Sequence, residues 1–103
     1  MKTPIPEVIL EPKRGYRGQM CVIKVGTLLY LQSYSTVLIE YNMDTGDICV
    51  LDWHNSATTS RHVRYFFEYI NEVPYLERKI EEHGSIWKWL FDDVFDQGLR
   101  ESA

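Results

Sequence analysis

The residues best suited to chemistry lie together in the segment from Trp53 to Phe67. Histidines with serine and aspartate can form a hydrolytic triad, and histidines with other ligands can bind zinc. Hydroxyl groups beside an arginine at the start of a helix can bind an anion. The segment carries two histidines, four hydroxyl side chains and two arginines: His54, His62, Ser56, Thr58, Thr59, Ser60, Arg61 and Arg64.

A metal site is not expected in this segment. His54 and His62 are eight positions apart, and His83 is distant in the sequence. Zinc needs three or four ligands at a motif spacing, and no pair of cysteines lies nearby to complete such a set. We therefore predict no metal and no cofactor, and we expect the histidines to be hydrogen-bonded parts of the fold.

Hydrolysis is also not expected. Ser56, Ser60, His54, His62 and Asp52 supply the residue types of a triad, as many short polar stretches would. The chain has no Gly-x-Ser-x-Gly turn to hold a nucleophile. Ser60 and His62, two positions apart on one helix, would point to different sides. We therefore assign no catalytic residue and expect a protein that is not an enzyme.

Anion binding remains open as an alternative. The free amides of a helix start, the hydroxyls of Thr58, Thr59 and Ser60, and the guanidinium of Arg61 would suit a phosphate or a carboxylate. The competing interpretation is structural, because the same hydroxyls can cap the helix and form a buried polar cluster.

The segment is the joint between two halves of different pattern. Before it, apolar and β-branched runs alternate with turn residues, and the Asp44–Gly46 turn predicts a hairpin. After it, apolar residues recur at helical spacing, as in Val63, Phe66, Phe67 and Ile70. The strand-like runs are residues 20–25, 27–32, 34–42 and 47–53, and Gly26 separates the first two.

The helical half has clear start and stop signals. The first helix should begin within residues 58–60 and end near Glu72, because Pro74 disfavours helix at the preceding residue. Beyond Pro74, either one helix is kinked at Gly84 or two helices meet there. We favour two, with Ser85 capping the second and Gly98 ending it.

These patterns predict an α+β fold. At 103 residues, 45% of them hydrophobic, the chain should form one domain with a packed core. We expect an extended, proline-containing N-terminal arm (residues 1–19), with at most a short strand at residues 8–10. A three- to four-stranded antiparallel sheet (20–53) follows, and then two or three helices (58–103) packed on it.

Composition limits the setting. A net charge of −4 and an isoelectric point near 5.3 argue against direct binding to nucleic acid, which needs clustered cations. Cys21 and Cys49 lie in apolar runs, and we expect buried thiols rather than a disulfide, which suits a cytoplasmic location. No apolar run approaches the roughly 20 residues of a membrane span, and we expect no signal peptide.

The segment after Pro74 is acidic and aromatic, with seven acids against four bases. A run of carboxylates can imitate a phosphate backbone, although such a face is often only solvated. The helical spacing of the apolar residues after Pro74 places Trp87 in the core, and Trp89 would then be an exposed contact. The predicted partner-binding residues are Glu81, Glu82, Trp89, Asp92, Asp93 and Asp96.

Two motifs together resemble a known family. Ser33-Tyr34-Ser35-Thr36 precedes a hairpin, and Ser56-Ala57-Thr58-Thr59-Ser60-Arg61-His62 leads to Phe66. This pattern is similar to a domain of unknown function that recurs in small tailed-bacteriophage proteins and related bacterial genes. The resemblance covers about Gly26 to Phe67, and it carries no catalytic residue.

The resemblance implies a role for the joint and a setting for the protein. Thr36, Thr58, Thr59 and His62 would form a hydrogen-bonded network between sheet and helix. Small acidic phage proteins include inhibitors of host machinery, such as anti-CRISPR and other anti-defence proteins. We therefore expect a non-catalytic inhibitor of a host defence or nucleic-acid-processing complex with a basic surface. The alternative is a small enzyme or a nucleotide- or phosphate-binding module using residues 58–62, and a homodimer stays open.

Overall fold

A computed structural model describes residues 6–10, 20–53 and 57–102 of the chain, with side chains described for residues 6, 7, 20–53 and 57–96. The chain divides into two compact units, Met1–Leu51 and Asp52–Ala103. The boundary coincides with the predicted change from strands to helices. Each unit is described by itself, and the packing of the helices on the sheet stays a prediction.

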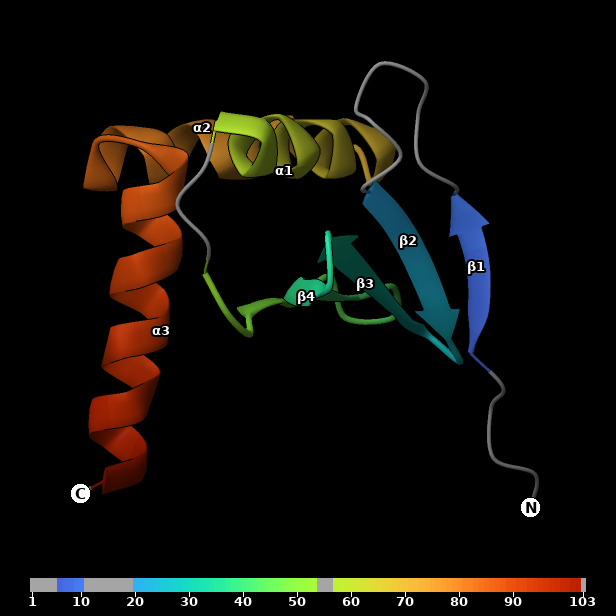
Figure 1. Ribbon diagram of the computed structural model, residues 1–103, viewed down its shortest axis with the longest axis horizontal. Helices are drawn as coiled ribbons and strands as arrows, with labels where there is room; N and C mark the ends of the chain where they lie inside the picture. Colours follow the sequence, from blue (N-terminus) through green and yellow to red (C-terminus); the bar gives the residue numbers. More distant parts are fainter. Residues whose placement is uncertain (1–5, 11–19, 54–56, 103) are drawn as a thin grey trace. The chain divides into compact units, whose positions relative to one another are not determined.

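The α+β prediction is confirmed: an antiparallel sheet is followed by three helices (Figure 1). Four strands lie in the part of the chain that was predicted to hold the sheet, and one more lies in the predicted N-terminal arm. The strands are β1 (Glu7–Leu10), β2 (Met20–Val25), β3 (Leu28–Ser33), β4 (Thr36–Asn42) and β5 (Ile48–Val50). The helices are α1 (Ala57–Tyr69), α2 (Val73–His83) and α3 (Ile86–Ser102).

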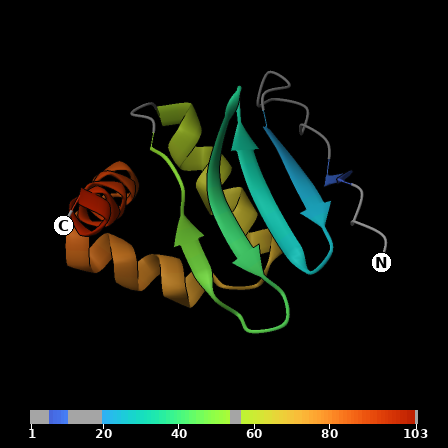
Figure 2. The same cartoon turned by 90° about the horizontal axis from the view of Figure 1, so that it is seen from below.

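The strands form a meander in which each strand pairs with its neighbour in the sequence, in the order β1-β2-β3-β4-β5 (Figure 2). Gly26, between β2 and β3, has a φ of 62°, and Gly46, between β4 and β5, has a φ of 78°. Glycine adopts these left-handed angles without strain. The amide of Gly46 donates to the carbonyl of Asn42 at 2.7 Å, so the predicted hairpin at Asp44–Gly46 is confirmed.

One face of the sheet is more deeply buried than the other. Val22 and Leu31 are opposite each other on β2 and β3, and both are fully buried. The register between β3 and β4 shifts after Leu31, and the consecutive residues Leu38 and Ile39 are both fully buried. Regular alternation along the predicted run 34–42 would put Val37 and Ile39 on one face, but the bulge places an extra residue between them and separates the two.

The other face of the sheet is half-buried and carries both cysteines, which do not form a disulfide. The absence of a disulfide is as predicted, but both thiols are half-buried rather than buried. Tyr30 lies opposite Glu40 on this face, and its hydrogen bond to that carboxylate raises the pKa of Tyr30.

The helix boundaries follow local signals. α1 begins at Ala57, one residue before the predicted range, and Pro74 lies in the first turn of α2. Gly84 is in a left-handed conformation after α2, and its amide donates to the carbonyl of Ile80 at 2.7 Å. The hydroxyl of Ser85 accepts from the amide of Lys88 at 3.2 Å, so two capped helices are confirmed.

The predicted stop at Gly98 is wrong, because α3 continues to Ser102. Glycine in a helix interior costs about 0.5–1 kcal/mol relative to alanine, which is a weak penalty for a helix already anchored by its buried first turns. A glycine ends a helix only when the backbone turns left-handed there, as it does at Gly84.

The three helices share an aromatic core. The rings of Phe67 from α1 and Tyr75 from α2 stack with centroids 5.9 Å apart and planes 5° apart. Trp89 from α3 meets both edge-on, at 5.8 Å from Phe67 and 6.1 Å from Tyr75. Each helix therefore contributes at least one aromatic side chain to this core.

Candidate functional site

The start of α1 is largely buried. Thr59 and His62 are buried, with 1% and 0% of their surface exposed, and Thr58 and Ser60 are half-buried. Only Arg61 of the proposed anion site is exposed. Burial lowers the pKa of His62, so its imidazole is neutral at neutral pH and brings no positive charge to an anion.

Thr36 was predicted to join this cluster from the sheet. It lies on β4, opposite Ser33 on β3, and belongs to the unit Met1–Leu51. A hydrogen-bonded network that links Thr36 with Thr58, Thr59 and His62 stays a prediction. His54 and Ser56 lie outside the described residues.

No metal site and no pocket are found in the described part of the chain. Among residues 6–10, 20–53 and 57–102, no three histidine, cysteine or carboxylate side chains come together as a metal site. No pocket opens within either described unit.

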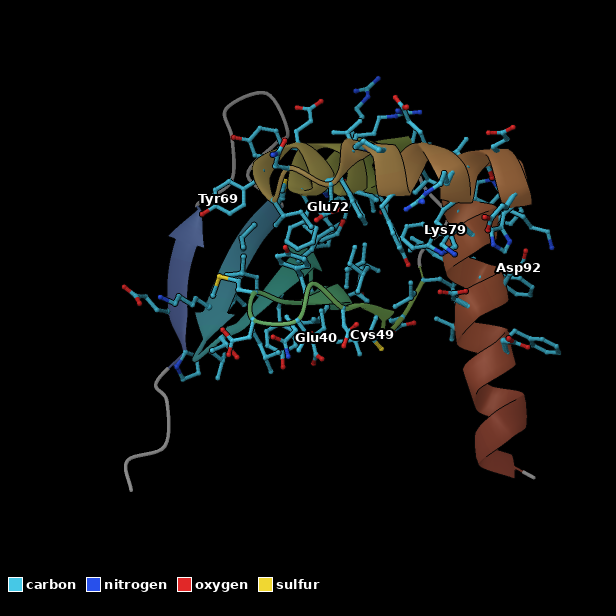
Figure 3. The ribbon with its side chains drawn as sticks, turned by 180° about the vertical axis from the view of Figure 1, so that it is seen from behind. Glu40, Cys49, Tyr69, Glu72, Lys79 and Asp92 are labelled. Atoms are coloured by element: carbon cyan, nitrogen blue, oxygen red, sulfur yellow. The ribbon has the colours of Figure 1, made fainter. Side chains whose placement is uncertain are left out.

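The acidic segment contains one carboxylate with a structural task. His83 Nδ1 and Asp92 Oδ2 are 2.8 Å apart, and Lys88 Nζ donates to Asp92 Oδ1 at 2.9 Å. Figure 3 labels Asp92 on α3. The bonds from Lys88 and His83 hold the pKa of Asp92 below its usual value. Since His83 ends α2, Asp92 fastens α3 to the end of α2.

The other predicted acids have different surroundings. Glu81 is exposed, while Glu82 is exposed but lies 3.5 Å from Lys79. Asp96 is also exposed. Asp93 is half-buried, and its charge adds to the burial that raises the pKa of Tyr75. The five predicted acids therefore differ in exposure, because Asp92 and Asp93 are half-buried while the other three are exposed.

The prediction that Trp87 is buried and Trp89 exposed is wrong, and the structure shows the reverse. Trp89 is fully buried, while 39% of the Trp87 surface is exposed. The reason is the starting residue of α3: Ile86, Trp89 and Leu90 stand at i, i+3 and i+4 and form the buried stripe. Trp89 cannot be the exposed anchor of an interface.

A second aromatic stripe, which the sequence reasoning missed as a surface, runs along another side of α3. Trp87, Phe91 and Phe95 stand four residues apart, and we call them the aromatic ridge. Phe91 and Phe95 stack at 6.0 Å, and Trp53 meets Phe91 edge-on at 5.1 Å. Phe95 has 59% of its surface exposed, the most among the large hydrophobic side chains of the described residues.

A signal for the ridge was present in the sequence. Residues at i, i+4 and i+8 drift by only about 40° per step around a helix, so three aromatics at that spacing form one row. The sequence prediction assigned Trp87 to the core, and it therefore merged this row with the neighbouring buried row of Ile86, Trp89 and Leu90. The sequence spacing does not say which of the two rows is buried, and the exposure of the side chains in the structure decides it.

Comparison with known proteins adds no relative. No family model matches the chain, and neither a curated protein nor a solved structure matches it. The resemblance to the phage domain stays a prediction. Among the described residues, no helix has the length and apolar composition that a membrane crossing requires.

Proposed function

We propose that this chain is a non-catalytic binding protein that attaches through its helical unit to a basic surface of another protein. The observation that carries the proposal is the aromatic ridge. Two of its three rings are substantially exposed, although the same helix has already buried Ile86, Trp89 and Leu90 in the core. Large aromatic side chains are the usual anchors of protein interfaces.

The charge of the same segment supports a basic partner. From Pro74 to the end of the chain there are seven acids and four bases, a net charge of −3 with histidine neutral. Exposed carboxylates on α2 and α3, such as Glu81 and Asp96, extend this charge along the surface. Complementary charge mainly speeds association, so binding should weaken as salt rises.

We place the partner among host defence or nucleic-acid-processing complexes. Such complexes carry basic grooves, and the resemblance to a phage domain supports the role of an inhibitor that occupies one of them, as anti-CRISPR proteins do. Direct binding to nucleic acid is not part of the proposal, because the phosphate backbone would repel an acidic surface. A host cytoplasm is the setting that the proposal implies.

The test is capture of host proteins on the immobilised full chain, followed by mass spectrometry. Three versions should be compared: the natural chain, Trp87→Ala with Phe95→Ser, and Tyr69→Ala as the control. Tyr69 is a suitable control because it has 45% of its surface exposed and lies on α1, away from the ridge in sequence. A specific partner should be retained by the natural chain and the control, and lost by the ridge variant.

A charge-reversal variant that tests the acidic surface must leave the fold intact. Asp92→Lys would break the bonds to His83 and Lys88 that fasten α3 to α2, so a loss of binding could reflect a loss of structure. Glu81→Lys avoids this problem, because no ion pair of Glu81 is found within the described residues. Recovery of the same partner by the ridge variant at low salt would place the interface elsewhere.

A further inference from the structure

The half-buried face of the sheet carries mostly apolar side chains. Residues that are directly paired across neighbouring strands lie on the same side of a sheet, and pairing joins four strands into one row on this face. The row runs from β2 to β5 and consists of Ile23, Tyr30, Glu40 and Cys49. Figure 3 labels Glu40 and Cys49, which are neighbours in this row. All four side chains are half-buried, so part of each is open to solvent.

This composition is unusual for a sheet face that meets only water. Such a face normally carries polar side chains at alternate positions of each strand. On β2, however, this face carries Cys21, Ile23 and Val25, while Met20 and Val22 are buried on the other face. A strand that is largely apolar on both sides is typical of a sheet that is covered on both faces.

Glu40 is the only charged residue among the described strand residues of this face. It accepts a hydrogen bond from the hydroxyl of Tyr30, and this bond raises the pKa of Tyr30. No ion pair of Glu40 is found within the described residues. Burying a carboxylate without a charged partner is costly, so an occupant of this face must bring a cation to Glu40.

The charge and the shape of the surface select the kind of occupant. An extended peptide would pair with the edge of a sheet rather than with its face. A second copy of this sheet would bring its own Glu40 to the same surface, and two carboxylates repel each other. A helix with an apolar stripe fits a sheet face, and a lysine or arginine within the stripe would meet Glu40.

We propose that the half-buried face of the sheet binds an amphipathic helix of a partner protein, with a lysine or arginine of that helix paired to Glu40. The apolar side chains around Glu40 exclude water from the pair, which strengthens the attraction between the two charges. This surface lies in the unit Met1–Leu51, whereas the aromatic ridge lies in the unit Asp52–Ala103. The inference therefore does not depend on the proposed function.

The probes are two synthetic amphipathic peptides of about 18 residues, long enough to form a helix. Both carry a leucine stripe on a background of alanine and glutamine, and they differ at one central position of the stripe. One peptide has arginine there, and the other has citrulline, which resembles arginine in shape but is uncharged. Each is titrated at low salt into the full ¹⁵N-labelled chain. We expect the arginine peptide to shift the amides of Ile23, Tyr30 and Cys49 and to bind about three- to tenfold more tightly than the citrulline peptide.

Matched variants separate the charge from the apolar surface. Glu40→Gln keeps an acceptor for the hydroxyl of Tyr30 but removes the charge, and it should reduce the preference for arginine to about twofold or less. Ile23→Thr keeps a β-branched residue in the strand but removes apolar surface, and it should weaken the binding of both peptides. Asp44→Asn is the control, because this exposed acid lies in the turn after β4, and it should leave the preference unchanged. Thermal unfolding of each variant checks that the fold is kept.

Equal binding of the two peptides, a full preference for arginine in Glu40→Gln, or amide shifts confined to residues 57–102 would overturn the inference. So would the absence of binding at millimolar peptide. Sedimentation tests the second copy: a dimer of the natural chain that dissociates in Ile23→Thr would make another copy the occupant and would also overturn the inference. The proposed function fails separately, because Trp87→Ala with Phe95→Ser should leave the binding of both peptides unchanged.

Discussion

Exchanging the roles of the two tryptophans leads to opposite predictions for two similar substitutions. Trp89→Ala removes a fully buried ring that contacts Phe67 and Tyr75. Truncating a buried tryptophan to alanine costs about 3–5 kcal/mol. For a domain of this size each kcal/mol lowers the melting temperature by roughly 4–8 °C, so Trp89→Ala should lower it by at least about 12 °C.

Trp87→Ala should behave as a surface substitution. Its ring is 39% exposed, and the cost should stay within about 1 kcal/mol. The same variant should weaken partner binding, because it removes one end of the aromatic ridge. Stability and binding are therefore expected to separate: the buried tryptophan controls the first and the exposed tryptophan the second.

Trp89→Phe refines the prediction. The indole Nε1 of Trp89 is buried and has no hydrogen-bond acceptor among the described residues. Removing a buried donor without a partner recovers about 1–3 kcal/mol, whereas the smaller ring leaves a cavity that costs on the order of 1 kcal/mol. The two effects oppose each other, so Trp89→Phe should be far milder than Trp89→Ala and close to neutral.

The assay is thermal and urea unfolding followed by circular dichroism at 222 nm, which reports the helices. All three variants and the natural chain should be measured under one set of conditions. A larger loss of stability for Trp87→Ala than for Trp89→Ala would refute the assignment of the two faces of α3. A loss in Trp89→Phe as large as in Trp89→Ala would show that the indole donor is satisfied.

Other predictions concern the turn, the joint and the thiols. Gly84→Ala should cost about 1–2 kcal/mol in unfolding experiments, because φ is 97° there, although nothing lies within 4 Å of an added Cβ. Ser85→Ala should cost about 1 kcal/mol, because the hydrogen bond that caps α3 is lost. Thr59→Val should lower the melting temperature by several degrees without affecting partner binding; the reverse result would favour an anion site. Burial lowers the pKa of His62, so the unfolded chain binds a proton at this histidine at a higher pH than the folded chain does. The stability of the natural chain should therefore decline below about pH 6.5, and that of His62→Ala should decline less steeply. Burial raises the pKa of Cys21, so its alkylation by iodoacetamide at pH 8 should be slower than that of a cysteine in a short peptide.

Local signals in the sequence determined the order and the type of the elements. Gly26 and Gly46 supply the left-handed turns of the meander, and Gly84 with Ser85 ends one helix and begins the next. These features depend on a few neighbouring residues and on backbone preferences, so they could be predicted without the rest of the molecule. The same holds for the division between a strand-rich half and a helical half.

Features that depend on register were decided by tertiary structure. The bulge between β3 and β4 buries Leu38 and Ile39 together, although alternation separated them. In the helical unit, the stripe of α3 that meets Phe67 and Tyr75 puts Trp89 inside and Trp87 outside. A shift of one or two residues costs little in local propensity but exchanges the faces of a strand or a helix, so contacts between distant elements choose among registers that the sequence leaves nearly equal.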